Sequence, residues 1–347
     1  MAVCTHKWGR FLAAFAYYLL GSYNITETVA SYYGGPSWWL GVLAWVIASV
    51  TLAFPWAFAN GFWRSIIVLL FTTIPPLGCI GWLSPLTAAG VLYPSSNLWG
   101  VGLITVLFCA LINIRLSHVH AKAVLGLGLW AVAMNLWMAT SSKIELPKGW
   151  ATIQTSFKPA GQNLFTKIKN QDLIIEAGLT QGAGSRVLVF PEAILDNWGI
   201  GTQMQFSQAI PTGQTWLLGA EINGRNSVIA ATANTTTMAV AQPLTTSAAL
   251  LLGGNWRPWT AQSLRPNWWQ KTFEIEGQRV WAALCVEQLL PWTWIEALWQ
   301  SPTLIIAQSN QWWSTTGSAV PSIQKSSTLA FGRLIGIPII FSQNLKK

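Results

Sequence analysis

Charged residues are scarce in this chain of 347 residues. Only 9% of its residues are Asp, Glu, Lys or Arg and 52% are hydrophobic, whereas a soluble globular domain carries about 25% charged residues. The scarcity is greatest in residues 1–142, where Glu27 is the only acidic residue. This composition argues against a wholly water-soluble protein and predicts a membrane part in residues 1–142.

Five apolar segments in that part approach the length of about 20 residues that crosses a bilayer as a helix. The third contains Pro75 and Pro76, which must interrupt the helix because proline lacks the backbone N–H group. A signal peptide is the rival interpretation of residues 1–24, but no small-residue cleavage site stands out and further apolar segments follow, which favours a retained span. The five predicted spans are residues 9–24, 37–54, 64–84, 97–114 and 123–141.

The basic residues predict how these spans are oriented. They lie before the first span and between alternate spans, whereas the intervening loops 24–37 and 84–96 contain no Lys or Arg. Because cytoplasmic loops gather Lys and Arg, we expect a multi-pass protein of the bacterial inner membrane with the residues after 142 in the periplasm. The basic residues concerned are Lys7, Arg10, Arg64, Arg115 and Lys122.

Residues 150–347 form a second predicted domain. Apolar strand-like runs alternate there with segments of helical periodicity, which predicts a layered α/β fold. The predicted strands are residues 186–194, 215–222, 227–234, 235–242, 279–287, 303–310 and 336–344, and the predicted helices are residues 292–300 and 322–336.

Cysteine and metal-ligand clusters are also scarce. Cys4, Cys79 and Cys109 lie in or beside the membrane part, which leaves Cys285 without a nearby disulfide partner. No metal-ligand spacing or glycine-rich phosphate loop occurs, so we expect no metal and no cofactor. The net charge of +9 includes no dense basic run, which suits contact with anionic lipids better than binding of nucleic acid.

Polar residues follow three of the predicted strands. Glu192 ends the strand in FPEAIL, Cys285 and Glu287 end the strand in LCVEQ, and Asn310 precedes Trp312 and Trp313. Ligand chemistry in open α/β folds collects at the carboxyl ends of strands. We therefore expect Cys285 to be a thiol nucleophile and Glu192 the base that takes its proton.

The motifs FPEAIL, LCVEQLL and SNQWW, in that order, resemble the nitrilase (carbon-nitrogen hydrolase) superfamily, whose fold is an αββα sandwich with a Glu-Lys-Cys triad. Such a domain after a helical bundle is similar to the arrangement of apolipoprotein N-acyltransferase. Residues 73–94, 309–327 and the Cys285 segment together are similar to the TraB-type conjugal transfer proteins of Ti-like plasmids, over roughly residues 60–345.

The resemblance implies a role for each matching residue. Glu192 would be the general base, Cys285 the nucleophile of a thioester mechanism, and Glu287 a supporting carboxylate. The backbone N–H group of Val286 would donate to the oxyanion. Asn310, Trp312 and Trp313 would wall the acyl pocket.

The chain departs from the family at the triad lysine. The resemblance places this lysine near residues 235–247, yet no Lys occurs between positions 192 and 271. Arg257 and Lys271 are the candidate substitutes. Two functions stay open: a membrane-anchored carbon-nitrogen hydrolase or N-acyltransferase that modifies a pilin, lipoprotein or mating-pair protein, and a degenerate scaffold that binds such proteins.

Each candidate residue also has a structural interpretation. Cys285 could be a small buried hydrophobic residue, and Glu192 could cap a helix. Glu287 could pair in the core with Arg279 or Arg333. The two tryptophans Trp312 and Trp313 could serve packing alone.

Overall fold

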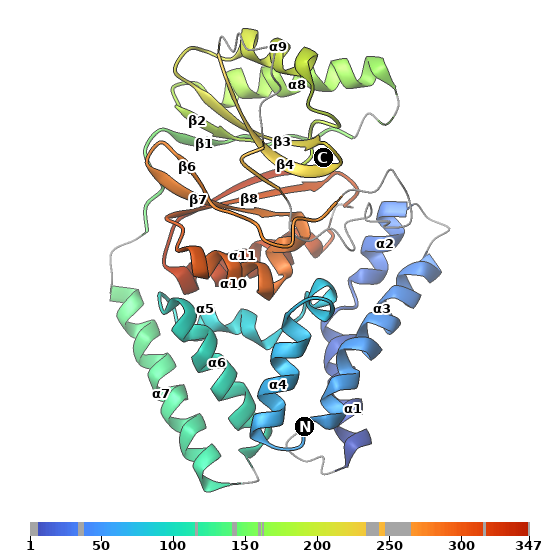
Figure 1. Cartoon of the computed structure of the whole chain (residues 1–347), viewed down its shortest axis with the longest axis vertical. Coiled ribbons are helices and arrows are strands. Elements are labelled where there is room, and N and C mark those ends of the chain that lie inside the picture. The colour runs from blue at the N-terminus through green and yellow to red at the C-terminus, as the bar shows by residue number, and fades with distance from the viewer. Residues whose placement is uncertain are drawn as a thin grey trace. The chain divides into compact units, whose positions relative to one another are not determined.

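The computed structural model describes residues 6–33, 38–114, 117–140, 144–158, 161, 163–233, 243–246, 265–314 and 317–345. The chain divides into two compact units (Figure 1). The helical unit comprises Met1–Ile144, Leu289–Trp299 and Ser322–Gly336. The sheet unit comprises Glu145–Gln288, Gln300–Pro321 and Ile337–Lys347.

The helical unit contains the apolar N-terminal helices and two helices from the C-terminal half of the chain. Short 3-10 helices (η) join several of them. The elements are α1 (Lys7–Gly21), α2 (Ile25–Tyr33), α3 (Trp38–Ala53), η2 (Phe54–Phe58), α4 (Phe62–Thr73), η3 (Leu77–Ile80), η4 (Pro85–Ala88), α5 (Ala89–Leu92), α6 (Asn97–Ile112), α7 (His118–Thr140), α10 (Pro291–Gln300) and α11 (Val320–Ile335).

Two helical segments of the described residues are long and apolar enough to cross a membrane. They are Trp38–Phe58 and His118–Thr140. A third span results if Pro85–Leu92 and Asn97–Ile112, which meet at a bend of 120°, count as one. The described chain therefore holds two or three spans by length and composition, fewer than the five predicted.

Local breaks explain the difference. Helix α4 ends at Thr73 and is followed by short 3-10 turns, because Pro75 and Pro76 cannot donate the hydrogen bonds that would continue it. The predicted third span, 64–84, is therefore not one helix. The sequence predicts a loop at residues 24–37, but they contain α2, which packs so closely on α3 that a Cβ at Gly41 would lie 2.6 Å from the carbonyl oxygen of Thr26.

Helix α11 packs against α5, α6 and α7 within the helical unit. A Cβ added at Gly90 of α5 would clash with the carbonyl oxygen of Ala330. The backbone N–H group of Ser95 donates to the carbonyl oxygen of Arg333 at 2.7 Å, and the Arg333 side chain donates to Oδ1 of Asn135 in α7 at 2.9 Å. The helical unit thus includes two helices that the sequence places after residue 150.

Two mixed sheets form the sheet unit. The first has the order β1-β2-β3-β4-β5, with β1, β2 and β3 parallel, and the second has the order β6-β7-β8-β9, with β7, β8 and β9 parallel. The elements are β1 (Trp150–Thr152), α8 (Leu164–Gln181), β2 (Val187–Val189), α9 (Ile200–Ala209), β3 (Thr215–Ile222), β4 (Arg225–Thr232), β5 (Thr245–Thr246), β6 (Phe273–Ile275), β7 (Gln278–Leu284), β8 (Leu304–Gln311) and β9 (Ile339–Leu345).

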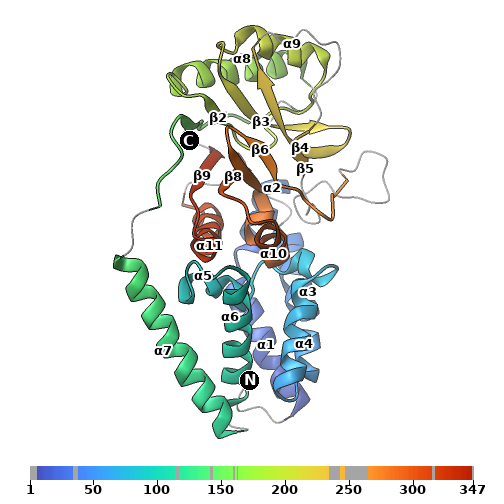
Figure 2. The same ribbon diagram turned by 60° about the vertical axis from the view of Figure 1, so that its left-hand side comes forward.

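Alternate residues of the first sheet face two hydrophobic cores. Leu188, Trp216 and Leu218 pack with Ile174 of α8 and Phe206 of α9, and Figure 2 shows both helices on that side of the sheet. Residues of the opposite parity, including Val187, Val189 and Leu217, pack with the second sheet. Helices, first sheet and second sheet are therefore three successive layers, as the period of two along a strand requires.

The sequence predicts most of these elements. Every predicted strand within the described residues corresponds to a strand, and residues 292–300 and 322–336 correspond to α10 and α11. The predicted combination of helices and sheets is confirmed, and both sheets are mixed. Residues 235–242 lie outside the described residues, and α8 and α9 were not predicted.

The close contact at Gly90 gives a testable prediction. We expect Gly90→Ala to lower the thermal unfolding midpoint of the detergent-solubilised chain, because overpacking a contact typically costs about 1–3 kcal/mol. Gly102→Ala in α6 is the matched control, since a Cβ there meets nothing within 4 Å. It should leave the midpoint unchanged or raise it. Equal midpoints for the two variants would contradict this packing.

Candidate functional site

Glu192 lies in a tight turn that follows β2. Val187, Leu188 and Val189 are fully buried, and the chain then turns at Ala193, whose φ is 44°. This turn rests on β3 at Gly219, where an added Cβ would lie 2.6 Å from the Cα of Glu192. Only glycine fits there, so Gly219 allows the turn to hold the Glu192 side chain in a position that is 8% exposed.

Cys285 stands at the junction between β7 and the 3-10 helix η6 (Cys285–Leu289). Its φ of 45° lies in the left-handed region, which is unusual for a residue with a side chain. Such backbone conformations concentrate at functional sites, where the surrounding structure has to maintain them. The cysteine is half-buried.

The Glu287 side chain helps to maintain this junction. It is 1% exposed, and its Oε2 accepts a hydrogen bond from the backbone N–H group of Leu284 at 3.0 Å. The neighbouring Gln288 donates to the carbonyl oxygens of Ala283 and Gln308 at 3.2 and 3.1 Å. Both side chains therefore tie η6 to the ends of β7 and β8.

The Glu192 carboxyl group accepts hydrogen bonds from the ends of three strands. Its donors are the Cys285 thiol, the Asn226 side chain and the backbone N–H group of Asn310. The Asn226 Nδ2 atom lies 2.5 Å from Oε1 of Glu192. The Asn310 side chain donates to the carbonyl oxygen of Ala193 at 3.1 Å, which fixes β8 to the same turn. Three predicted residues, Glu192, Cys285 and Asn310, thus meet at one place.

Burial controls the protonation of this group. It raises the pKa of Glu192 to about 7 from the ordinary value of 4.5, and the hydrogen bonds from Cys285, Asn226 and Asn310 partly oppose the increase. Among the described residues, no Lys or Arg forms an ion pair with Glu192. The carboxyl group therefore exchanges its proton near neutral pH, the range that suits a general base.

Four more of the predicted residues lie within the described part of the chain. Val286 is half-buried in η6 directly after Cys285, Lys271 is exposed before β6, and Trp312 and Trp313 are half-buried directly after β8. Arg257 lies outside the described residues, as does most of 235–247, where the lysine was expected. The roles of these residues stay predictions.

Asn226 is the site residue that the sequence prediction missed. It is 4% exposed, and its Oδ1 atom accepts no hydrogen bond within the described residues. The sequence nevertheless contains a signal for the position of Asn226. Asn223 and Gly224, both with positive φ, are the Asn-Gly pair that predicts a two-residue hairpin, and this hairpin returns β4 beside the end of β3 with Asn226 opposite Glu221.

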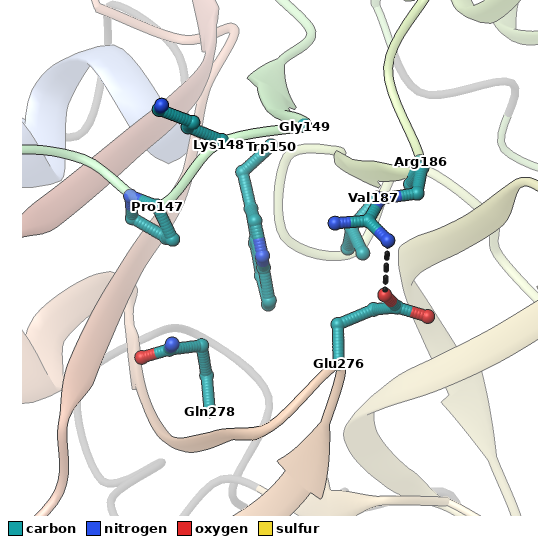
Figure 3. A pocket seen from close by; sticks show the side chains of 8 residues that line it. All are labelled: Pro147, Lys148, Gly149, Trp150, Arg186, Val187, Glu276 and Gln278. Carbon is teal, nitrogen blue, oxygen red and sulfur yellow. Dashed lines mark ion pairs between the residues drawn. The ribbon is translucent and has the colours of Figure 1, made fainter.

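A cavity of about 300 Å³ lies elsewhere in the sheet unit (Figure 3). Its lining includes Trp150, Val187 and Gln278, the first residues of β1, β2 and β7, whereas Glu192 and Cys285 follow the last residues of their strands. Figure 3 shows Arg186 pointing toward Glu276, and their charged atoms are 3.3 Å apart. This cavity is therefore separate from the candidate site.

No protein-family model matches the chain. Two curated proteins are similar to it over most of its length. One is the conjugal transfer protein TraB of Agrobacterium fabrum, 28% identical over 365 aligned residues that cover 94% of this chain and 81% of the relative. Another is the probable conjugal transfer protein TraB of Sinorhizobium fredii, 28% identical over 357 aligned residues that cover 96% of this chain and 87% of the relative.

The raised pKa of Glu192 predicts a pH-dependent stability. Because the folded pKa of about 7 exceeds the ordinary 4.5, the folded chain binds an extra proton between these pH values. Its contribution is complete below pH 4.5 and is lost as the pH rises through 7, a change of roughly 3 kcal/mol. We expect Glu192→Gln to remove this part of the decline, measured as unfolding free energy against pH.

Glu176→Gln is the control for that measurement, since Glu176 is exposed on α8. Burial also raises the pKa of Asp196 and of Glu221, but both groups remain in each variant and cancel in the comparison. Identical pH profiles for the Glu192→Gln and Glu176→Gln proteins would contradict the raised pKa.

Proposed function

We propose that this protein acts in conjugal plasmid transfer as a membrane-anchored, nitrilase-like thiol amidase or acyltransferase. The names of its two relatives support the process, and two helices of spanning length support the anchoring. The observation that carries the chemistry is the hydrogen bond between the Cys285 thiol and the buried carboxyl group of Glu192. A thiol beside a base with a pKa near 7 is the arrangement of nucleophilic catalysis.

Each residue has a defined part in the proposed reaction. Glu192 takes the thiol proton as the sulfur of Cys285 attacks an acyl carbon, and the resulting oxyanion accepts a hydrogen bond from the N–H group of Val286. The C–N bond then breaks, and Glu192 returns the proton to the departing amine. In the second half, Glu192 deprotonates water or an acceptor amine, which attacks the thioester and releases the thiol.

The side-chain carbonyl oxygen of Asn226 gives this site a second polar contact. Oδ1 is buried beside Glu192 and accepts no hydrogen bond within the described residues. A substrate N–H group would satisfy it, whereas an ester would not. This difference favours an amide donor or an amine acceptor.

The layers of the sheet unit support the nitrilase-like part of the proposal. Two sheets share one core, and α8 and α9 cover the outer face of the first. An αββα sandwich adds one further helical layer on the second sheet.

The distribution of Lys and Arg supports a periplasmic sheet unit. With the five spans that the sequence predicts and the basic loops in the cytoplasm, the residues after about 142 would lie in the periplasm. A pilin, a lipoprotein or another protein of the mating apparatus is then within reach as acyl donor or acceptor.

A second candidate function is a catalytically degenerate scaffold that binds mating-apparatus proteins. One observation favours it. Within the part of the chain that the structure describes, the side-chain donor to Glu192 besides Cys285 is the neutral amide of Asn226, and the sequence has no lysine between positions 192 and 271. Loss of a transition-state hydrogen-bond donor typically costs about 10²- to 10³-fold in rate. A site of this composition is therefore slow or serves binding alone.

Labelling of Cys285 tests the thiol chemistry directly. We expect a thioester-forming acyl donor to add one acyl group to the purified chain, detected by intact mass and located at Cys285 by peptide mapping. The rate should rise as the pH passes about 7, where Glu192 ionises, and Glu192→Gln should abolish that rise. Cys79→Ser, which changes a buried cysteine of the helical unit, is the control and should label normally.

Plasmid transfer between cells distinguishes the enzyme from the scaffold. Under the enzyme proposal, the Cys285→Ala and Glu192→Gln double variant transfers a plasmid at a rate far below wild type while accumulating to the same level in the membrane. Normal transfer by this variant would reject the enzyme and retain the scaffold. The frequency of plasmid transfer, with protein abundance measured by immunoblot, is the readout.

A further inference from the structure

A cavity of about 450 Å³ opens within the helical unit, between α1, η2 and α4. Helices α1 and α4 run side by side in both views (Figures 1 and 2). Three basic side chains line the cavity: Lys7 and Arg10 from α1 and Arg64 from α4. None of them belongs to the Cys285 site, so the following inference does not rest on the proposed function.

The three cations differ in their exposure and contacts. Arg10 is 9% exposed, and its Nε and Nη2 atoms donate to the carbonyl oxygen of Ala57 at 3.2 and 2.8 Å, which fixes the guanidinium at the end of η2. Lys7 and Arg64 are exposed. The ammonium of Lys7 lies 5.7 Å from the centre of the Trp8 ring.

No acidic residue is among the lining residues of the cavity. Glu27 is the only acidic residue among residues 1–142, and it does not line the cavity. The first turn of α4 adds to the positive potential of the three cations, because its N-cap is Gly61 and no side chain caps it. Backbone N–H groups at such a helix start favour an anion.

The other side of the cavity is apolar and lies at the end of a membrane span. Phe58, 58% exposed, ends the span Trp38–Phe58, and Ile67 of α4 is 65% exposed. Trp8 and Trp63, each next to a cavity cation in sequence, are 57% and 75% exposed. Exposed tryptophans are enriched where a membrane meets water. The cations and the exposed apolar side chains of the cavity would therefore lie together at the depth of the lipid headgroups.

From this arrangement we propose that the cavity binds the phosphate group of an anionic phospholipid of the phosphatidylglycerol class. Lys7, Arg10 and Arg64 hold the phosphate oxygens, and the acyl chains lie along Phe58 and Ile67. A basic pocket between membrane helices is a recurrent form of lipid-headgroup recognition. A free phosphate compound would use the same cations but not the exposed apolar side chains.

The test is a lipid titration of the detergent-solubilised full chain, followed by native mass spectrometry. Dioleoyl-phosphatidylglycerol should bind saturably, and dioleoyl-phosphatidylcholine should bind much more weakly. We expect Lys7→Gln and Arg64→Gln each to weaken phosphatidylglycerol binding about five-fold and the double variant about 25-fold, from the usual effect of one basic residue near an anionic membrane. Arg64→Lys keeps the charge and should retain most of the affinity.

Lys122→Gln is the matched control, because Lys122 is an exposed cation of α7 outside the cavity. It should leave the affinity unchanged. An equal loss with Lys122→Gln and Arg64→Gln would mean attraction to general surface charge and would overturn the site, as would equal affinity for the two lipids. Thermal unfolding midpoints verify that the variants fold. Arg10 is left intact because its guanidinium supports η2.

A second experiment distinguishes binding of a lipid headgroup from binding of a soluble phosphate compound. Inorganic phosphate and glycerol phosphate are titrated without lipid and then used as competitors. Weak competition at high concentration supports a lipid headgroup site. Binding of inorganic phosphate alone that depends on Arg64 and matches the lipid in affinity would overturn the lipid assignment.

Discussion

The burial of one carboxyl group, that of Glu192, is the constraint on which the rest of the sheet unit depends. Removing it from water raises its pKa to about 7, and hydrogen-bond donors directly after β7, in β4 and in β8 partly oppose the increase. These strands belong to both sheets, so the donors meet only if the sheets stay aligned. The core between the sheets holds them, and the Gln308 side chain adds a 2.5 Å hydrogen bond from β8 to the carbonyl oxygen of Phe190, two residues before Glu192.

Within the described residues, the surroundings of this carboxyl group differ from a Glu-Lys-Cys triad. A neighbouring lysine would stabilise the ionised carboxylate and lower its pKa, whereas the amide of Asn226 contributes a hydrogen bond without a charge. Glu192 is consequently a base that is half protonated at neutral pH. This property suits a reaction in which a carboxyl group both takes and returns a proton.

Sequence reasoning is most successful where a feature is local. Continuous apolar runs identify β3, β7 and β8, and the rule that ligands gather at strand ends correctly predicts that Glu192, Cys285 and Asn310 meet. Asn226 was missed because its position depends on how a hairpin returns along β3. Fewer of the described helices than predicted are long enough to span a membrane, because apolar composition does not show where a helix ends, as at Thr73. The packing of α11 on Gly90 is a contact between distant segments, which periodicity cannot report.

The most direct test of the central claim is the titration of Glu192 itself, observed by the infrared difference between wild-type and Glu192→Gln protein. A protonated carboxyl band that is present at pH 5.5 and disappears with a midpoint near pH 7 is the predicted result, and Cys285→Ala should raise that midpoint because it removes a hydrogen bond that lowers the pKa. A midpoint near 4.5 that Cys285→Ala does not change would contradict the account.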